Sequence, residues 1–155
     1  MNDVTGWIQS FEGLRFKLYR DTSGHISIGY GRNLEAVGIS KPEADTLFAN
    51  DLQAAKLAAT IAFGFDAWNN LDPVRQAALT DMAFNLGSAG LEGFKNMLAF
   101  VRSGDFDHAA DELMNSRYAT ELPKRAEANA TLIRTGIWPG DDPTVSENAG
   151  AADIG

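Results

Sequence analysis

The sequence predicts an α+β fold that is mainly helical and consists of two lobes joined by a long helix. Residues 16–30 hold a short alternating pattern typical of a β-hairpin. Residues 41–64 are Ala-rich and only partly apolar, as expected for a helix that links two lobes. Residues 65–138 are more hydrophobic and break into shorter segments with helical periodicity. We expect a small lobe at about 13–40 with a hairpin or short antiparallel sheet, a connecting helix, and a larger all-helical lobe that includes an N-terminal helix at 3–12.

The N-terminal segment has the apolar spacing of an amphipathic helix. Its large apolar side chains recur at positions i, i+3, i+4 and i+7, namely Val4, Trp7, Ile8 and Phe11. Asp3 precedes them as a candidate N-cap, and Gly13 follows as a helix stop. Glu12 falls in the last turn, at the end of an apolar helix face, where a carboxyl group is expected to lose water. Loss of water raises the pKa of a carboxyl group, which favours a proton donor.

A β-hairpin is expected next, with its turn at the sequence DTSG. On the returning strand the apolar residues Ile26, Ile28 and Tyr30 alternate with smaller or polar ones, which predicts one apolar face. Asp21 lies at the mouth of the turn and Ser27 on the returning strand. Their side chains are placed to face the same gap.

The connecting helix has a clear start signal. Ser40 and Glu43 stand three residues apart, with Pro42 in the first turn, which is the pattern of a capping box. The helix is expected to end at about Gly64. In the larger lobe a helix is expected to begin after Asp72, followed by helical segments at about 91–103, 106–115, 117–120 and 123–134.

Composition and charge limit the classes of function. The chain has 155 residues, 45% of them hydrophobic and 22% charged, which fits a single globular domain. It has no cysteine, so disulfides and thiolate metal sites are excluded. The net charge of -8 argues against nucleic acid as a partner. Half of this charge comes from the four acidic residues of 139–155, a Pro/Gly/Ala-rich tail that is expected to be disordered.

No membrane anchor or export signal is expected. No apolar run approaches the ~20 residues that span a bilayer. The first residues, MNDVTGWIQSFEGLRF, lack a basic start and an unbroken apolar stretch, so they do not resemble a signal peptide. The protein is therefore expected to be made in the cytoplasm, and any action outside the cell would need a separate release step.

Glu12, Asp21 and Ser27 together suggest the chemistry of glycosidic-bond cleavage. Two carboxyl groups on either side of a gap, one partly buried and one solvated, can act as a proton donor and as the group that handles water. A hydroxyl beside the second carboxylate can hold that water in line. The alternative is chance, because a chain with 21 acidic residues contains many such pairs. The three residues alone leave both interpretations open.

Short motifs in a fixed order run along nearly the whole chain. In the first third they are Glu12-Gly-Leu-Arg, Tyr19-Arg-Asp21-Thr-x-Gly, Ser27-Ile-Gly-Tyr-Gly31 and Ile39-Ser-Lys-Pro-Glu-Ala-Asp-x-Leu-Phe. Further on they are the run from Arg75 to Gly87, Gly93-Phe94-x-Asn96, Ser116-Arg117-Tyr118, Pro123-x-Arg125-Ala126 and Arg134-Thr-Gly-x-Trp138. Together they resemble glycoside hydrolase family 24, the phage-type lysozymes or endolysins, over about residues 5–138. The resemblance implies the lysozyme-like form of the two-lobe fold.

The resemblance also implies a role for three residues near the hairpin. In this family the glutamate at the position of Glu12 is the general acid, while the aspartate at Asp21 and a hydroxyl residue, usually Thr, position the nucleophilic water. The reaction inverts the anomeric centre. Here Ser27 stands in place of Thr, which keeps the oxygen but loses the methyl group that stiffens χ1. An inverting enzyme predicts roughly 6.5–9.5 Å between the two carboxyl groups.

Two supporting contacts follow from the same resemblance. The family's arginine at the position of Arg125 reaches the catalytic glutamate, here Glu12. The family commonly has His at the position of Arg32, and Asp51 matches its acidic partner on the connecting helix. We therefore predict an Arg32–Asp51 ion pair, which would not switch off near neutral pH because arginine stays charged there.

Four further residues are candidates for substrate binding. Phe84 matches an aromatic residue that lines the family's sugar cleft, although it could equally be a core residue. Asn85 could offer amide hydrogen bonds to an N-acetyl group, or it could be a solvated helix residue. Ser116 and Arg117 could contact sugar or peptide, whereas a helix cap and a surface residue are the alternative interpretation.

The predicted function is hydrolysis of the β-1,4 bond between N-acetylmuramic acid and N-acetylglucosamine in bacterial peptidoglycan, by a phage endolysin that lyses its host. The enzyme is expected to be a monomer that reaches the wall after holin-dependent release. No cofactor is expected and no metal, because His25 and His108 lack the spacing of metal ligands and are expected at the surface. Two alternatives remain: a catalytically inactive peptidoglycan-binding module, and a lytic transglycosylase, which cleaves the same bond without water.

Overall fold

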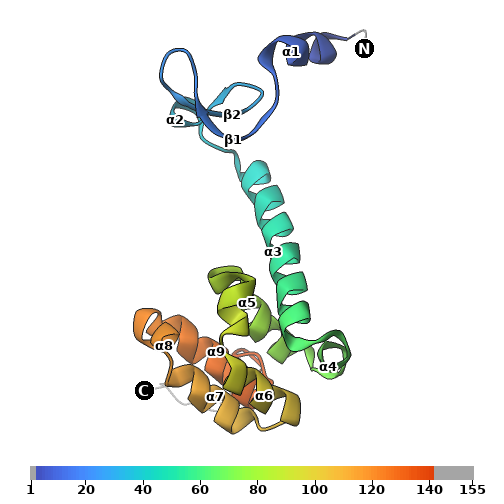
Figure 1. The fold of residues 1–155 in the computed structure, drawn as a ribbon, viewed down its shortest axis with the longest axis vertical. Helices are drawn as coiled ribbons and strands as arrows, with labels where there is room; N and C mark the ends of the chain where they lie inside the picture. Colours follow the sequence, from blue (N-terminus) through green and yellow to red (C-terminus); the bar gives the residue numbers. More distant parts are fainter. Residues whose placement is uncertain (1–2, 142–155) are drawn as a thin grey trace, which may run out of the picture. The chain divides into compact units, whose positions relative to one another are not determined.

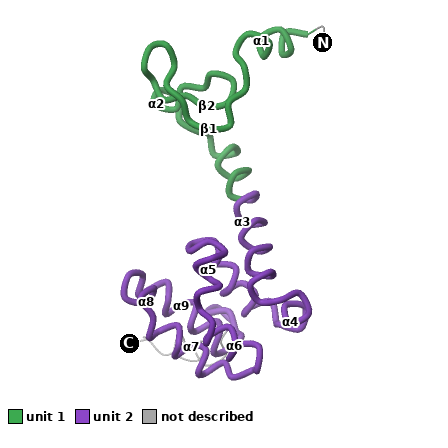
Figure 2. The backbone as a smooth tube through the Cα atoms, in the orientation of Figure 1, with its two compact units in different colours: residues 1–48 green, residues 49–155 purple. Residues whose placement is uncertain are grey.

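A computed structural model describes residues 3–141 and divides the chain into two compact units. The first unit is Met1–Phe48 and the second is Ala49–Gly155 (Figure 2). Within the described residues the first unit contains a three-stranded antiparallel sheet, and the second unit is helical. The predicted α+β, mainly helical fold is therefore confirmed. Residues 142–155, which hold most of the acidic tail, lie outside the described part.

The small sheet consists of three strands that pair in the order β1, β2, β3, of which β1 and β2 are labelled in Figure 1. The bounds are Arg15–Arg20 for β1, Ile26–Gly29 for β2 and Arg32–Asn33 for β3, and the short helix α2 follows at Leu34–Val37. Both pairings are antiparallel, and they place Ser27 opposite Tyr19 on one side and Asn33 on the other. The predicted hairpin is thus extended by a third short strand, which makes Ser27 part of a central strand.

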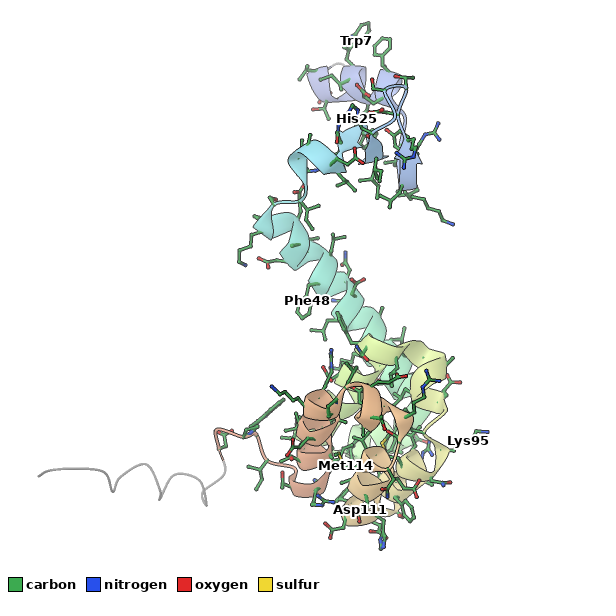
Figure 3. The ribbon with its side chains drawn as sticks, turned by 90° about the vertical axis from the view of Figure 1, so that its left-hand side faces the viewer. Trp7, His25, Phe48, Lys95, Asp111 and Met114 are labelled. Atoms are coloured by element: carbon green, nitrogen blue, oxygen red, sulfur yellow. The ribbon has the colours of Figure 1, made fainter. Side chains whose placement is uncertain are left out.

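Helix α1 (Val4–Glu12) begins and ends where the sequence predicted. Asp3 caps its start, because its carboxylate accepts a hydrogen bond from a backbone N–H of the first turn at 2.8 Å. Gly13 ends the helix with φ at +68°, a conformation that favours glycine. The apolar side chains of α1 are exposed in this unit, and the ring of Trp7 (Figure 3) meets Phe11 edge-on at 5.0 Å.

Helix α3 (Lys41–Phe63) has the predicted capping box at its start. Oε2 of Glu43 accepts hydrogen bonds from the backbone N–H and the hydroxyl of Ser40, each at 2.7 Å. At the other end Arg102 donates to the carbonyl of Phe63 at 2.9 Å and to that of Ala62 at 2.8 Å. A cation at this end also interacts favourably with the helix dipole. Side chains therefore form hydrogen bonds with backbone groups at both ends of α3.

The second unit builds its core from the helices that follow α3. Their bounds are Phe65–Asn70 for α4, Pro73–Glu92 for α5, Lys95–Ser103 for α6, Phe106–Met114 for α7, Arg117–Glu121 for α8 and Pro123–Thr135 for α9. Helix α7 packs against α6 and α9, and α9 also packs against α5 and α8 (Figure 1). The largest fully buried apolar side chains are Leu79, Met82, Leu91, Met97, Leu113 and Ile133. Buried alanines between them allow the close packing typical of protein interiors.

One helix boundary differs from the prediction. The sequence suggested a helix that starts near residue 91, whereas α5 continues to Glu92 and α6 starts at Lys95. Leu91 is fully buried in the last turn of α5. Gly87 interrupts α5 with φ at +73°, a conformation that favours glycine.

Candidate active site

The first unit brings Glu12 to the turn between β2 and β3. Glu12 is the last residue of α1, and its Oε2 lies 2.9 Å from the position that a Cβ atom on Gly31 would take. The carboxylate therefore lies directly against the Gly31 backbone, whose φ is +81°. The sequence suggested that the carboxyl group of Glu12 is partly removed from water. Within the first unit Glu12 is exposed, so the residues of this unit do not shield it from water.

The turn between β1 and β2 holds the carboxylate of Asp21 in one orientation. Its Oδ1 accepts hydrogen bonds from the backbone N–H groups of Ser23 and His25, each at 2.9 Å. The other oxygen, Oδ2, lies 3.6 Å from Nδ1 of His25. The hydrogen bond from the His25 N–H lowers the pKa of Asp21, whereas partial burial raises it. The Ser23 N–H and the His25 ring lower the pKa further, so the net shift is downward. Asp21 is therefore ionised at neutral pH.

Ser27 is the most enclosed residue of the sheet, with 1% of its surface exposed. Its Oγ makes no hydrogen bond with another group of residues 3–141. A buried hydroxyl without a partner costs free energy, and this Oγ is too enclosed for a water molecule to touch it in this arrangement of the sheet. The sequence predicted that Ile26 and Ile28 form the apolar, enclosed face of the sheet. Both are only half-buried, and Ser27 between them is the more enclosed residue.

Within the first unit Arg32 pairs with an acidic residue at the start of α3. Its Nη1 lies 2.5 Å from Oε1 of Glu43, and its Nε donates to the carbonyl of Gly38 at 2.7 Å. Glu43 comes before Asp51 in α3, and the capping box already holds its carboxylate at the start of the helix. Within the first unit Glu43 is thus the acidic partner of Arg32, and the predicted pair with Asp51, a residue of the second unit, stays a prediction.

In the second unit Arg125 binds Asp81 through two parallel hydrogen bonds. Its Nε and Nη2 donate to the two carboxylate oxygens at 2.9 and 2.6 Å, and the side-chain amide of Asn129 donates to Oδ2 at 2.8 Å. Burial raises the pKa of Asp81, but the hydrogen bonds from Arg125 and Asn129 outweigh it and the net shift is downward. The predicted contact of Arg125 with Glu12 would join the two units, and it stays a prediction.

Phe84 lines a pocket of about 380 Å³ in the second unit, a volume within the usual range of ligand pockets. Asp51 and Ser88 line the same pocket, and alanines of α3 form much of its wall. Phe84 is 39% exposed, so it is not simply a core residue. Asn85 is exposed on the same helix, and it is not one of the residues that line this pocket.

Ser116 and Arg117 make local contacts at the start of α8. Oγ of Ser116 accepts a hydrogen bond from a backbone N–H of the first turn at 3.2 Å, which is the contact of a helix cap. Nε of Arg117 lies 2.6 Å from the carboxylate of Glu121 at the surface. Ser116 also lines a pocket of about 610 Å³ together with Lys95 and Glu112. These are the contacts of a helix cap and of a surface ion pair, Ser116 also borders a cavity, and the predicted contacts with substrate stay predictions.

Three contributors to these contacts were not predicted from the sequence. Gly31 belongs to a quoted motif, but its contact with Glu12 depends on how α1 meets the sheet. His25 was expected only as a surface residue, although its place four residues after Asp21 across a tight turn was a usable signal. Asp81 gave no signal, because its partner Arg125 lies 44 residues further along the chain.

Between residues 3 and 141 no three His, Asp or Glu side chains are grouped so that they could hold a metal ion. Over the same range no helix combines the length and the apolar character needed to cross a bilayer.

Comparison with known proteins identifies the family. Residues 9–130 match the family model described as phage lysozyme. The chain is 28% identical to a probable T4-type lysozyme 2 of Dictyostelium discoideum, over 81% of this chain and 89% of that protein. It is 31% identical to the endolysin of Bacillus phage B103, over 83% and 51% of the two chains, and 30% identical to the pre-baseplate central spike protein Gp5 of Enterobacteria phage T4, over 81% and 26%. The chain therefore belongs to the phage lysozyme family, and as a member of it the protein is a glycoside hydrolase that acts on peptidoglycan.

Proposed function

We propose that the protein is an N-acetylmuramidase that hydrolyses the β-1,4 bond between N-acetylmuramic acid and N-acetylglucosamine with inversion of the anomeric centre. The observation that carries this proposal is the fixed carboxylate of Asp21, held by two backbone N–H groups and kept ionised by them. The match to the family supports Ser27 as the residue whose hydroxyl holds the attacking water, and this role requires the sheet to open slightly around its enclosed Oγ. Membership of the family supports Glu12 as the third member of the site.

Each group has one task in this mechanism. Glu12 donates a proton to the oxygen of the leaving sugar as the glycosidic bond breaks. Oδ2 of Asp21, the oxygen that accepts neither backbone N–H group, takes a proton from the attacking water, while Oγ of Ser27 holds that water in line with the anomeric carbon. The water attacks from the face opposite the leaving group, so the configuration inverts. This geometry needs roughly 6.5–9.5 Å between the carboxyl groups of Glu12 and Asp21.

Residues of the second unit complete the proposed substrate site. The partly exposed ring of Phe84, in its pocket, supports contact with a sugar, and Asn85 would bind an N-acetyl group. Ser116 and Arg117 would contact sugar or peptide at the mouth of the site. Arg125 would reach Glu12 and hold its side chain.

We infer the domain organisation from the same resemblance. Residues 1–138 form one lysozyme domain, with a small lobe at about 13–40, a connecting helix at about 41–64 and a helical lobe at about 65–138 that includes the N-terminal helix. Residues 139–155 form an acidic tail.

The biological role that fits this activity is lysis of a bacterial host by a phage. A relative from a Bacillus phage carries the name endolysin. In this role the enzyme is a monomer that is made in the host cytoplasm and reaches the cell wall after release by a holin.

The first test is clearing of a suspension of permeabilised Gram-negative cells. Wild type is expected to clear it, and Glu12→Gln is expected to lower the rate by about 10²–10⁴-fold, because the proton donor is lost. Glu35→Gln makes the same chemical change at an exposed residue of α2 and is expected to match wild type. If wild type leaves the turbidity unchanged, or Glu12→Gln clears at full rate, the proposal fails.

Analysis of the products separates the remaining alternatives. Mass spectrometry is expected to find reducing N-acetylmuramic acid ends, because water enters the bond. Anhydro-muramyl ends would instead identify a lytic transglycosylase. A protein that binds peptidoglycan and releases no product would be a binding module. Proton NMR of the first products is expected to show the α anomer, as inversion at a β bond requires.

A further inference from the structure

The imidazole of His25 lies beside the carboxylate of Asp21 at the end of the β1–β2 turn (His25 is labelled in Figure 3). Nδ1 of His25 is 3.6 Å from Oδ2 of Asp21, and the ring is half exposed. The two residues are also tied through the backbone: the N–H of Asp21 donates to the carbonyl of His25 at 3.0 Å. The ring is therefore held next to the carboxylate by the turn itself.

The two oxygens of Asp21 have different surroundings. Oδ1 accepts the backbone N–H groups of Ser23 and His25. Oδ2 is the oxygen that faces the His25 ring. Under the proposed function, on which this inference rests, Oδ2 is also the oxygen that takes the proton of the attacking water. The ring and the water therefore compete for one atom.

We propose that His25 is a positioning residue whose protonation controls whether Oδ2 of Asp21 is available to the nucleophilic water. A neutral ring at 3.6 Å is too far away for a strong hydrogen bond, so it leaves Oδ2 to the water. An imidazolium ring is attracted to the carboxylate, and a small rotation brings its N–H within hydrogen-bond distance. Activity is therefore expected to fall as the pH drops through the range between 5 and 8 in which histidine changes charge.

Arg20 is a further charged side chain bonded to this turn. Asp21 is the acid within ion-pair distance of His25. From β1, Arg20 donates from Nη1 to the carbonyl of Gly24 at 2.7 Å. Arginine keeps its charge in proteins, so Arg20 adds a constant field, and the proposal assigns the pH dependence to the His25 ring.

The test compares pH profiles of cell-wall lysis between pH 5 and 8 for wild type, His25→Gln and His25→Phe. Wild type is expected to lose about fivefold in rate at the acid end, the effect of one charge about 4 Å away in water. Both variants lack the titrating ring and are expected to stay nearly flat over this range. The matched control is His108→Gln, which removes the second of the two histidines of the chain. His108 also pairs with an aspartate, Asp105 at 2.8 Å, but in the second unit, so its loss should leave the wild-type profile unchanged.

A second readout does not depend on activity. The carboxyl carbon of Asp21 can be followed by ¹³C NMR during a pH titration of wild type and of His25→Gln. The pKa of Asp21 is expected to rise in the variant, because the charge and the hydrogen bond of the ring are lost. It should remain below the ordinary value, since the two backbone N–H groups stay in place. This readout reports the contact itself.

The outcomes separate this inference from the proposed function. If wild type does not lyse cell walls at any pH, the proposed function fails and the role of His25 fails with it. If wild type is active but the profiles of His25→Gln and His25→Phe overlay that of wild type, only the role of His25 is overturned. An equal loss of rate at every pH in both variants also overturns it, because a purely structural role would produce that result.

Discussion

At the scale of single residues, Gly31 is where backbone conformation and proposed chemistry meet. Its φ of +81° favours glycine, and an added Cβ would lie 2.9 Å from Oε2 of Glu12. We expect Gly31→Ala to lower the free energy of unfolding by about 1–2 kcal/mol through backbone strain. It should also lower the rate of lysis by about 10–100-fold, because the methyl group displaces the proton donor. Urea denaturation and the turbidity assay measure the two effects.

The matched control for this prediction is Gly29→Ala in the same sheet. Gly29 also has a positive φ, +66°, but an added Cβ there meets no atom within 4 Å. This variant should show the strain without the displacement of Glu12. An equal loss of activity in the two variants would mean that the contact between Gly31 and Glu12 has no role in the reaction.

The sequence predicted the identities of the site residues better than their contacts. Glu12, Asp21 and Ser27 stand in motifs that can be read along the chain. The bonds that orient Asp21 come from N–H groups two and four residues later, and such short turns leave a sequence signal. Ser27 lies in a central strand because the two-residue strand β3 pairs with β2, and so short a strand gives no periodic pattern.

At the scale of elements, the start of α3 depends on Glu43. Its carboxylate accepts from Ser40 through Oε2 and pairs with Arg32 through Oε1, so one side chain fixes the helix start and the adjoining strand. We expect Glu43→Ala to lower the melting temperature clearly more than Asp45→Ala. Asp45 pairs only with exposed Lys41 in the same helix, and such pairs contribute little. Equal melting temperatures for the two variants would contradict this role of Glu43.

The effect of Glu43 should also depend on pH. The backbone N–H and hydroxyl of Ser40 lower its pKa, partial burial opposes them, and Arg32 lowers it further. Because the folded state holds this pKa below its ordinary value, the stabilisation is present near neutral pH and is lost as the pH falls through the folded pKa. In melting curves repeated at acid pH, the melting temperature of Glu43→Ala should therefore be close to that of wild type.

Element boundaries were predictable where the signal is local. Asp3 caps α1 and the Ser40–Glu43 pair caps α3, and both signals lie within four residues of the helix start. The end of α5 was not predictable in the same way. Leu91 in its last turn is buried in a core that later helices help to form, and such packing leaves no local signal.

At the scale of the whole molecule, arginines connect segments that are far apart in the sequence. Arg75 reaches the carbonyl of Ile133, 58 residues later, and Arg102 reaches back 39 residues to Phe63. Arg125 reaches back 44 residues to Asp81. Contacts of this kind carry no periodic signal, which is why the helical fold could be predicted and these pairs could not.

The Asp81–Arg125 pair gives the last prediction, because it joins α5 to α9 and titrates. The pair is more than a third exposed, so Asp81→Asn is expected to lower the free energy of unfolding by only about 1 kcal/mol at pH 7. The pKa of Asp81 is held below its ordinary value, so its stabilisation is lost as the pH falls through the folded pKa. Protonated Asp81 then resembles asparagine, and urea denaturation should find wild type and variant converging as the pH falls below the ordinary range of an aspartate. Glu121→Gln breaks the exposed pair with Arg117 inside α8 and should match wild type at both pH values. If Asp81→Asn lowers the free energy of unfolding as much at low pH as at pH 7, the contribution of Asp81 to the packing of α5 against α9 comes from its shape and not from its charge.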